Sequence, residues 1–132
     1  MLLNYLKSIE EKENFSALAL YLMKSEGHFN YPQKLLFDLY LKELETPFPS
    51  NSILENDAIL NKLCRFFENH PYKDIVYANL LLLAQVDHTE KEDENTTLTF
   101  IQEKLHIDLD TASKYMGELA IMQGDFFPDY LD

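Results

Sequence analysis

Apolar residues recur along most of the chain at intervals of three and four positions, which places them on one face of an α-helix. Residues 32–44 are the clearest case, because their leucines and Tyr40 follow this spacing. The alternation of apolar and polar residues that is typical of β-strands is nearly missing, and only 3 glycines and 5 prolines interrupt the helical pattern. The sequence therefore predicts an all-α fold, a compact bundle of about seven helices.

Capping residues and helix breakers predict where the helices begin and end. Ser16 is expected to cap the N-terminus of the second helix, and Gly27 to supply the left-handed conformation after its last turn. Ser52 and Thr89 each precede a glutamate by three positions, which is the spacing of a capping box. The two prolines of residues 46–50 predict a loop. After the N-terminal segment, helices are expected at about residues 16–26, 32–44, 52–70, 72–87, 89–105 and 108–122.

Residues 72–87 are apolar on nearly all sides, so we expect this helix at the centre of the bundle with other helices around it. A chain of 132 residues is expected to form one domain around a single core. Within that domain, the N-terminal helix is assigned to residues 1–14, the core to residues 15–124 and an acidic aromatic tail to residues 125–132.

The chain resembles itself at a displacement of 61 positions, which aligns residues 17–26 with residues 78–87. The same displacement pairs Phe37 with Leu98, Tyr40 with Ile101 and Leu44 with Leu105. Each copy has an apolar helix, an acidic turn and an amphipathic helix, so the pattern predicts two repeated helical hairpins whose apolar helices pack together. Chance similarity between two leucine-rich helices is the alternative.

The residues at the two turns carry a resemblance to a known family. The first apolar helix ends in Glu26-Gly27 with Gln33 seven positions after the acid, and the second ends in Asp87-His88 with Glu94 seven positions after the acid. This pattern resembles that of tellurite-resistance TerB-like domains, in which Asp-Gly and a later Glu usually occupy these positions; Gln33 and His88 depart from it. The resemblance covers about residues 15–123. It implies an all-helical cytoplasmic domain linked to stress responses, which handles cations or recruits partners without an established catalytic activity.

Negative charge is concentrated in the last third of the chain, because residues 86–132 hold 12 acids and 3 bases within a formal net charge of −12. This charge disfavours nucleic acid as a partner. Calcium, magnesium or manganese would need several convergent oxygen ligands. The candidate ligands of a weakly bound divalent cation are Glu26, Asp87, Glu90, Asp93 and Glu94. Helix capping and solvation of these carboxylates are the alternative, and a melting temperature unchanged by millimolar ion would exclude the cation site.

Residues 98–123 also resemble a helix-turn-helix, in which the second helix enters the major groove of DNA. His106 stands where such motifs favour glycine, and the second helix carries more acids than bases. A helix-turn-helix transcriptional regulator is therefore the alternative function. Binding of random duplex DNA at low salt would support it.

The sequence has no spacing typical of a catalytic site, so the chain is not expected to be an enzyme. Cys64 has apolar neighbours and is expected in the core rather than as a nucleophile. Phe126, Phe127 and Tyr130 are interspersed with acids in the tail and are the candidate residues for binding a protein partner. Packing of the tail on its own core is the alternative.

These observations together favour a non-catalytic cytoplasmic interaction module of the TerB-like type. The single cysteine and the polar N-terminal segment favour the cytoplasm over secretion. The longest run of aliphatic residues, residues 80–84, is too short for membrane insertion. A protein partner is expected, nucleic acid is not, and homo-oligomerisation is left open.

Overall fold

The computed structural model describes residues 2–25, 31–49, 57–86 and 94–126, and these residues contain helices but no β-strand. The prediction of an all-α fold is confirmed. The helices are η1 (Leu3–Tyr5, a single 3-10 turn), α1 (Ile9–Ser25), α2 (Tyr31–Leu44), α3 (Asp57–Phe67), α4 (Lys73–Gln85), α5 (Glu94–Leu105) and α6 (Leu109–Phe126). The described residues thus match the expected number of seven helices only if η1 is included.

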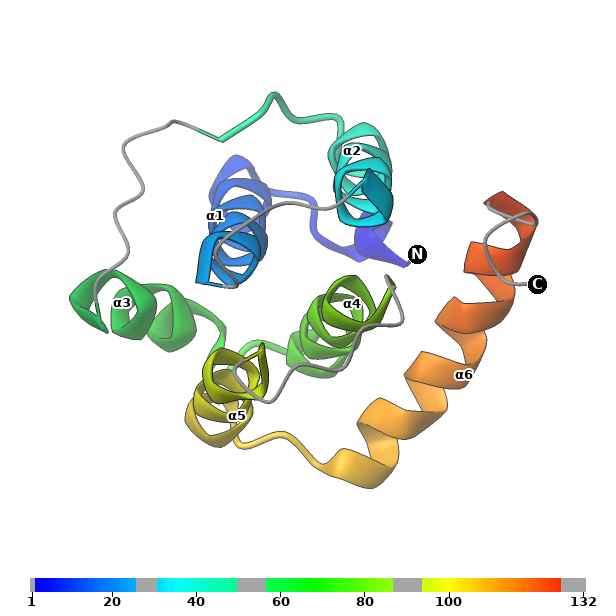
Figure 1. The fold of residues 1–132 in the computed structure, drawn as a ribbon. Helices are drawn as coiled ribbons and strands as arrows, with labels where there is room; N and C mark the ends of the chain where they lie inside the picture. The colour runs from blue at the N-terminus through cyan, green and yellow to red at the C-terminus, as the bar shows by residue number, and fades with distance from the viewer. Residues whose placement is uncertain (1, 26–30, 50–56, 87–93, 127–132) are drawn as a thin grey trace.

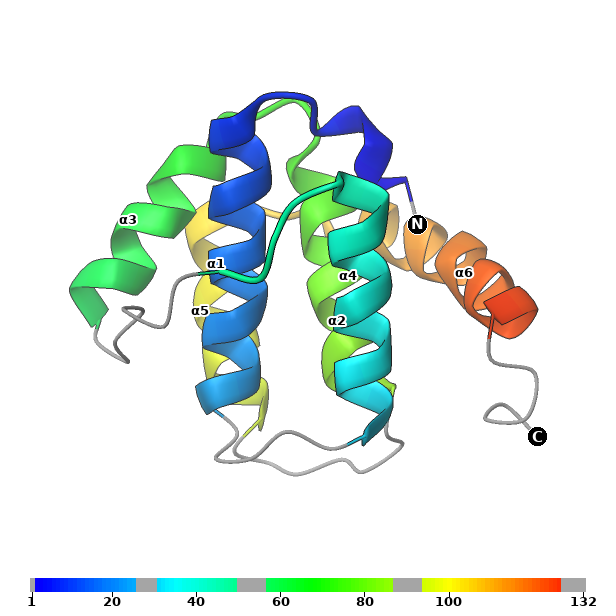
Figure 2. The same ribbon diagram turned by 90° about the horizontal axis from the view of Figure 1, so that it is seen from above.

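Four helices form the centre of the bundle. α1 and α2 run antiparallel to each other, as do α4 and α5, and the two pairs pack together (Figure 2). α1 and α4 are in direct contact. α3 packs beside α1 and α5. α6 contacts α4 and runs at a steep angle to it (Figure 1). This arrangement has the form expected for two helical hairpins, and the sequence duplication itself stays a prediction.

The central position predicted for the most apolar helix is confirmed. α4 contacts α1, α2, α5 and α6, and residues 75–84 are all buried except Leu81, which is half-buried. No helix in the described ranges is both long enough and apolar enough to cross a lipid bilayer.

The start of α1 differs from the prediction, because the helix begins at Ile9 and Ser16 lies in its interior. The N-terminal cap is Ser8, whose hydroxyl accepts a hydrogen bond from the Glu11 N–H while the Glu11 carboxylate accepts one from the Ser8 N–H, both at 3.0 Å. This is the reciprocal pattern of a capping box. Ser16 instead donates its hydroxyl proton to the Lys12 carbonyl at 2.8 Å, a bond that serine can make within a helix.

Glu11 also connects the start of α1 to the segment between α3 and α4. His70 Nε2 lies 2.5 Å from Glu11 Oε2, and His70 Nδ1 accepts a hydrogen bond from the Tyr72 N–H at 3.1 Å. Since Nδ1 is an acceptor, Nε2 carries the proton and donates to the carboxylate. Burial alone would raise the pKa of Glu11, but the hydrogen bonds from Ser8 and the adjacent His70 outweigh it, so the pKa lies below its usual value.

Replacement of Glu11 by glutamine (Glu11→Gln) is expected to lower the free energy of unfolding by about 1 kcal/mol at pH 7. Because the pKa of Glu11 is lowered by folding, the stabilisation is present above the unfolded-state pKa and is lost as the pH falls through the folded-state value. Urea unfolding at several pH values should therefore show the free energies of unfolding of the two proteins converging as the pH falls through the folded-state pKa of Glu11, which lies below 4.5. Glu10→Gln, at an exposed residue of the same turn, is the control. A difference that persists at acidic pH would contradict the assignment.

α2 and α5 end in the same way. Glu45 follows α2, His106 follows α5, and both have a left-handed φ of 54°. After α2, the N–H groups of Glu45 and of the residue that follows it donate to carbonyls of the last helical turn, both at 3.1 Å. After α5, the N–H groups of His106 and of the residue that follows it donate in the same way, at 3.3 and 3.1 Å. This is a Schellman motif, which usually contains glycine. Glu45 and His106 are separated by 61 positions, the displacement of the predicted repeat.

Two polar side chains tie α2 to α4 inside the bundle. The Tyr40 hydroxyl donates to the Asn79 carbonyl at 2.8 Å, and Gln33 Nε2 donates to the Leu83 carbonyl at 3.3 Å. Both Tyr40 and Gln33 are fully buried. Burial raises the pKa of Tyr40 well above its usual value. These bonds fix the position of α2 relative to the central helix.

Candidate functional site

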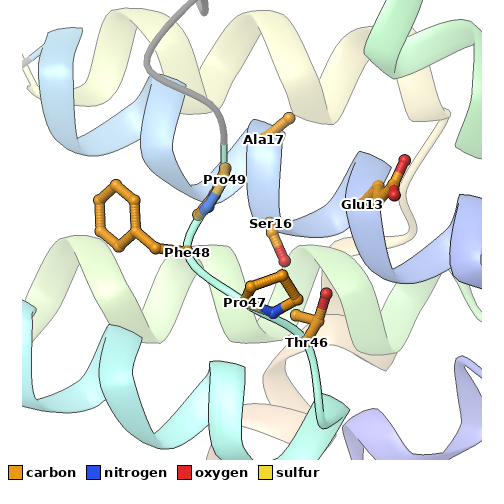
Figure 3. A pocket seen from close by; sticks show the side chains of 7 residues that line it. All are labelled: Glu13, Ser16, Ala17, Thr46, Pro47, Phe48 and Pro49. Carbon is orange, nitrogen blue, oxygen red and sulfur yellow. The ribbon is translucent and has the colours of Figure 1, made fainter.

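The described surface has a groove where the chain leaves α2 and crosses α1. The left-handed turn at Glu45 ends α2. Pro47 and Pro49 then lack the backbone N–H that a helix needs, so the four residues Thr46–Pro49, here called the proline segment, adopt no regular secondary structure. Figure 3 shows this segment passing over α1.

The groove has a volume of about 360 Å³ and is lined by residues of α1 and of the proline segment: Glu13, Ser16, Ala17, Thr46, Pro47, Phe48 and Pro49. Ser16 lies at the middle, with Glu13 towards one end and the Phe48 ring at the other (Figure 3). The orientation of the Ser16 hydroxyl in the groove is fixed by its hydrogen bond to the Lys12 carbonyl. Most of the lining is apolar, and Glu13 is its one charged member.

Phe48 separates this groove from a second cavity. Its ring meets the Phe37 ring edge to face, with centroids 5.7 Å apart and planes at 89°. The second cavity, of about 260 Å³, is lined by Met23, Lys34, Phe37, Asp38 and Phe48. Phe48 itself is 53% exposed. Phenylalanine is among the residues that are enriched at protein–protein interfaces relative to the rest of the surface.

The predicted cation ligands lie almost entirely outside the described residues. Nothing is described for Glu26, Asp87, Glu90 or Asp93, and Glu94 is described only as the first residue of α5. The helix ends that lead into the two acidic turns, those of α1, α2, α4 and α5, lie at one end of the bundle (Figure 2). Within the ranges that the structure describes, no group of three or more histidine, cysteine, aspartate or glutamate side chains could hold a metal ion.

Gln33 stands where the family pattern has a glutamate, and the structure shows what it does. Its side chain is 0% exposed and its amide donates to the backbone of α4. The Gln33 side chain therefore joins α2 to α4 inside the bundle.

The side chains of the candidate partner-binding residues of the tail are not described either. Phe126 is the last residue of α6 and only its backbone is described, and Phe127 and Tyr130 are not described.

The segment proposed as a helix-turn-helix does contain two helices, α5 and α6, joined by a short turn at His106. The start of α6 is organised by Asp108, whose carboxylate accepts hydrogen bonds from the Asp110 N–H and from the Thr111 hydroxyl, both at 3.1 Å. Asp110 and Leu109 are exposed there. The described surface at the start of α6 is therefore acidic.

The sequence analysis treated the proline segment only as a loop and missed the groove. The available signal was Phe48, a large apolar residue between two prolines. Such a residue is in a segment that cannot join a helix, so its ring must either pack on a neighbouring helix or stand in solvent. In the structure it does both.

Comparison of the chain with models of protein families, with curated proteins and with solved structures finds no match.

Proposed function

We propose that this chain is a non-catalytic protein-interaction module and that its partner binds at the groove between α1 and the proline segment. The observation that carries the proposal is Phe48, half-exposed between two cavities of about 360 and 260 Å³. Exposed aromatic rings next to preformed hollows are typical of interface centres, because they add much contact area and lose little entropy on binding.

The groove is also suited to binding because its shape is held before a partner arrives. The proline segment has restricted backbone angles at Pro47 and Pro49. Its first residue, Thr46, donates its N–H to the Leu41 carbonyl at 3.1 Å, and Phe48 rests on the buried Phe37 ring. A partner therefore meets a surface that needs little reorganisation, which reduces the entropic cost of association.

The experiment is affinity capture with the tagged full chain from the cells that encode it, comparing wild type with Phe48→Glu. Leu109→Glu is the matched control, because Leu109 is similarly exposed at 57% but lies on α6, away from the groove. The proposal expects Phe48→Glu to lose the captured proteins and Leu109→Glu to retain them. An unchanged set with Phe48→Glu, or a loss with Leu109→Glu alone, would contradict it.

The resemblance to TerB-like domains supports a module of this kind in the cytoplasm, linked to stress responses and tuned by a divalent cation. Two features agree with the predicted duplication behind that resemblance: the paired antiparallel helices, and the identical ends of α2 and α5 at Glu45 and His106. Calcium, magnesium or manganese remains the proposed cation, with the acidic turns at Glu26 and Asp87 as its place.

The alternative is a helix-turn-helix regulator that uses residues 98–123, and the observation in its favour is the pair α5 and α6 with a left-handed turn between them. Electrostatics make it the weaker candidate. Asp108, Asp110 and Glu118 stand on or beside α6 with only Lys114 as a base, whereas a recognition helix needs bases to neutralise phosphates.

A further inference from the structure

The charge of the groove determines which kind of partner it can bind. Glu13 is exposed and is the one charged side chain in the lining. No lysine, arginine or histidine among the described residues forms an ion pair with it, whereas Glu11 and Glu68 are hydrogen-bonded to His70 and His106. Its negative charge is thus available to a ligand.

A second carboxylate strengthens the negative potential at the same end of the groove. Glu10 is exposed and lies three positions before Glu13 on α1, and residues at this spacing are neighbours on a helix surface. The chain as a whole carries a formal charge of −12, which attracts cationic partners over longer distances. An anionic ligand would be repelled at this place.

The remaining lining is suited to an apolar side chain. Ala17, Pro47 and Phe48 offer hydrocarbon and ring surface, and a volume of about 360 Å³ falls at the lower end of the range of roughly 300–1,000 Å³ seen for ligand pockets. An aromatic or large aliphatic side chain in the groove would cover the exposed part of the Phe48 ring. The groove therefore combines an apolar seat with a carboxylate at its end.

We propose that the groove binds a basic segment of a partner protein, with a large apolar side chain of that segment against Ala17, Pro47 and Phe48 and a lysine or arginine beside Glu13. This inference rests on the proposed function and specifies its partner. Because the ring and the carboxylate lie towards opposite ends of the groove, a bound segment lies along α1 with its base pointing to the N-terminal end of the helix (Figure 3).

The test uses the isotope-labelled full chain and two short amidated peptides. One peptide alternates lysine or arginine with phenylalanine or leucine, and its twin carries glutamate in place of every base. The basic peptide is expected to shift the amide resonances of residues 13–17, Thr46 and Phe48, whereas its acidic twin is expected to leave them unchanged. Glu13→Lys is expected to lower the affinity of the chain for the basic peptide by about tenfold or more, because an attractive charge contact becomes repulsive.

Glu103→Lys is the matched control, because Glu103 is an exposed acid on α5 and its replacement changes the net charge equally. Glu103→Lys should leave the affinity for the basic peptide within about twofold of the wild-type value, since distant exposed charges are largely screened by salt. Equal weakening by Glu13→Lys and Glu103→Lys would show attraction by net charge only and overturn the inference. Equal binding of both peptides, absence of shifts, or shifts at another surface would also overturn it.

These outcomes are separable from those of the capture experiment. If Phe48→Glu loses its captured proteins while the basic peptide fails to bind, the groove is an interaction surface with a different specificity. If both experiments fail, the groove is not the interaction surface and the proposed function fails with this inference.

Discussion

Replacing Leu80 by alanine (Leu80→Ala) is expected to lower the free energy of unfolding by about 2–5 kcal/mol. Leu80 is 0% exposed and lies in α4, which contacts four other helices. Removal of its side chain deletes apolar contacts and leaves a cavity, and helices packed on several sides cannot all move inward to fill it. A domain of this size is typically stable by about 5–15 kcal/mol, so the loss is a large share of the total.

Urea or guanidinium unfolding, followed by circular dichroism, measures this loss. Leu109→Ala is the control, because Leu109 is 57% exposed at the start of α6 and alanine is a good helix former. The control should change the free energy of unfolding by less than about 0.5 kcal/mol. Similar losses in both variants would contradict the central position of α4.

The helices that the sequence predicted well are those whose signals are local. Residues 32–44 were expected as a helix and α2 spans Tyr31–Leu44, because Pro32 restricts the first turn and the apolar period is regular. α4 was expected at the centre because it is apolar on all sides, a property that is stable only when other helices surround it.

The start of α1 was predicted wrongly because two serines compete for the same role. Ser8 and Ser16 are both N-cap candidates, and Ser8 also has Glu11 at the spacing of a capping box. Residues 10–14 are polar, which favoured a break before Ser16, yet in the structure they form the more exposed first turns of α1. A serine hydroxyl can bond to a carbonyl within a helix, so Ser16 alone does not mark a helix start.

Long-range contacts explain what the sequence could not predict. The backbone N–H of Leu3, in η1, donates to the Glu43 carboxylate at 2.8 Å, and the groove forms where the proline segment meets Glu13 and Ser16 of α1. No spacing of residues in the sequence predicts either contact, since both depend on the way α1 and α2 pack. Phe48 gave the one local signal, and its meaning depends on the position of Phe37.

The Cys64 thiol is expected to react with Ellman's reagent at neutral pH at least about 100-fold more slowly in the folded protein than in the unfolded chain. Cys64 lies in α3 and is 1% exposed. Burial raises its pKa from 9.0 to about 11, and the positive charge of Lys104 only partly opposes this. The reactive species is the thiolate, so the raised pKa alone reduces its population about 100-fold, and exclusion of the reagent slows the reaction further.

The matched control is Lys62→Cys in a Cys64→Ala background, which moves the thiol to an exposed position of the same helix. That thiol should react at nearly the rate of the unfolded chain, because neither burial nor steric exclusion affects it. A native Cys64 that reacts within about tenfold of the control would mean that the thiol is accessible or ionised. In that case α3 would open readily from the bundle, and a redox or nucleophilic role for Cys64 would have to replace its assignment to the core.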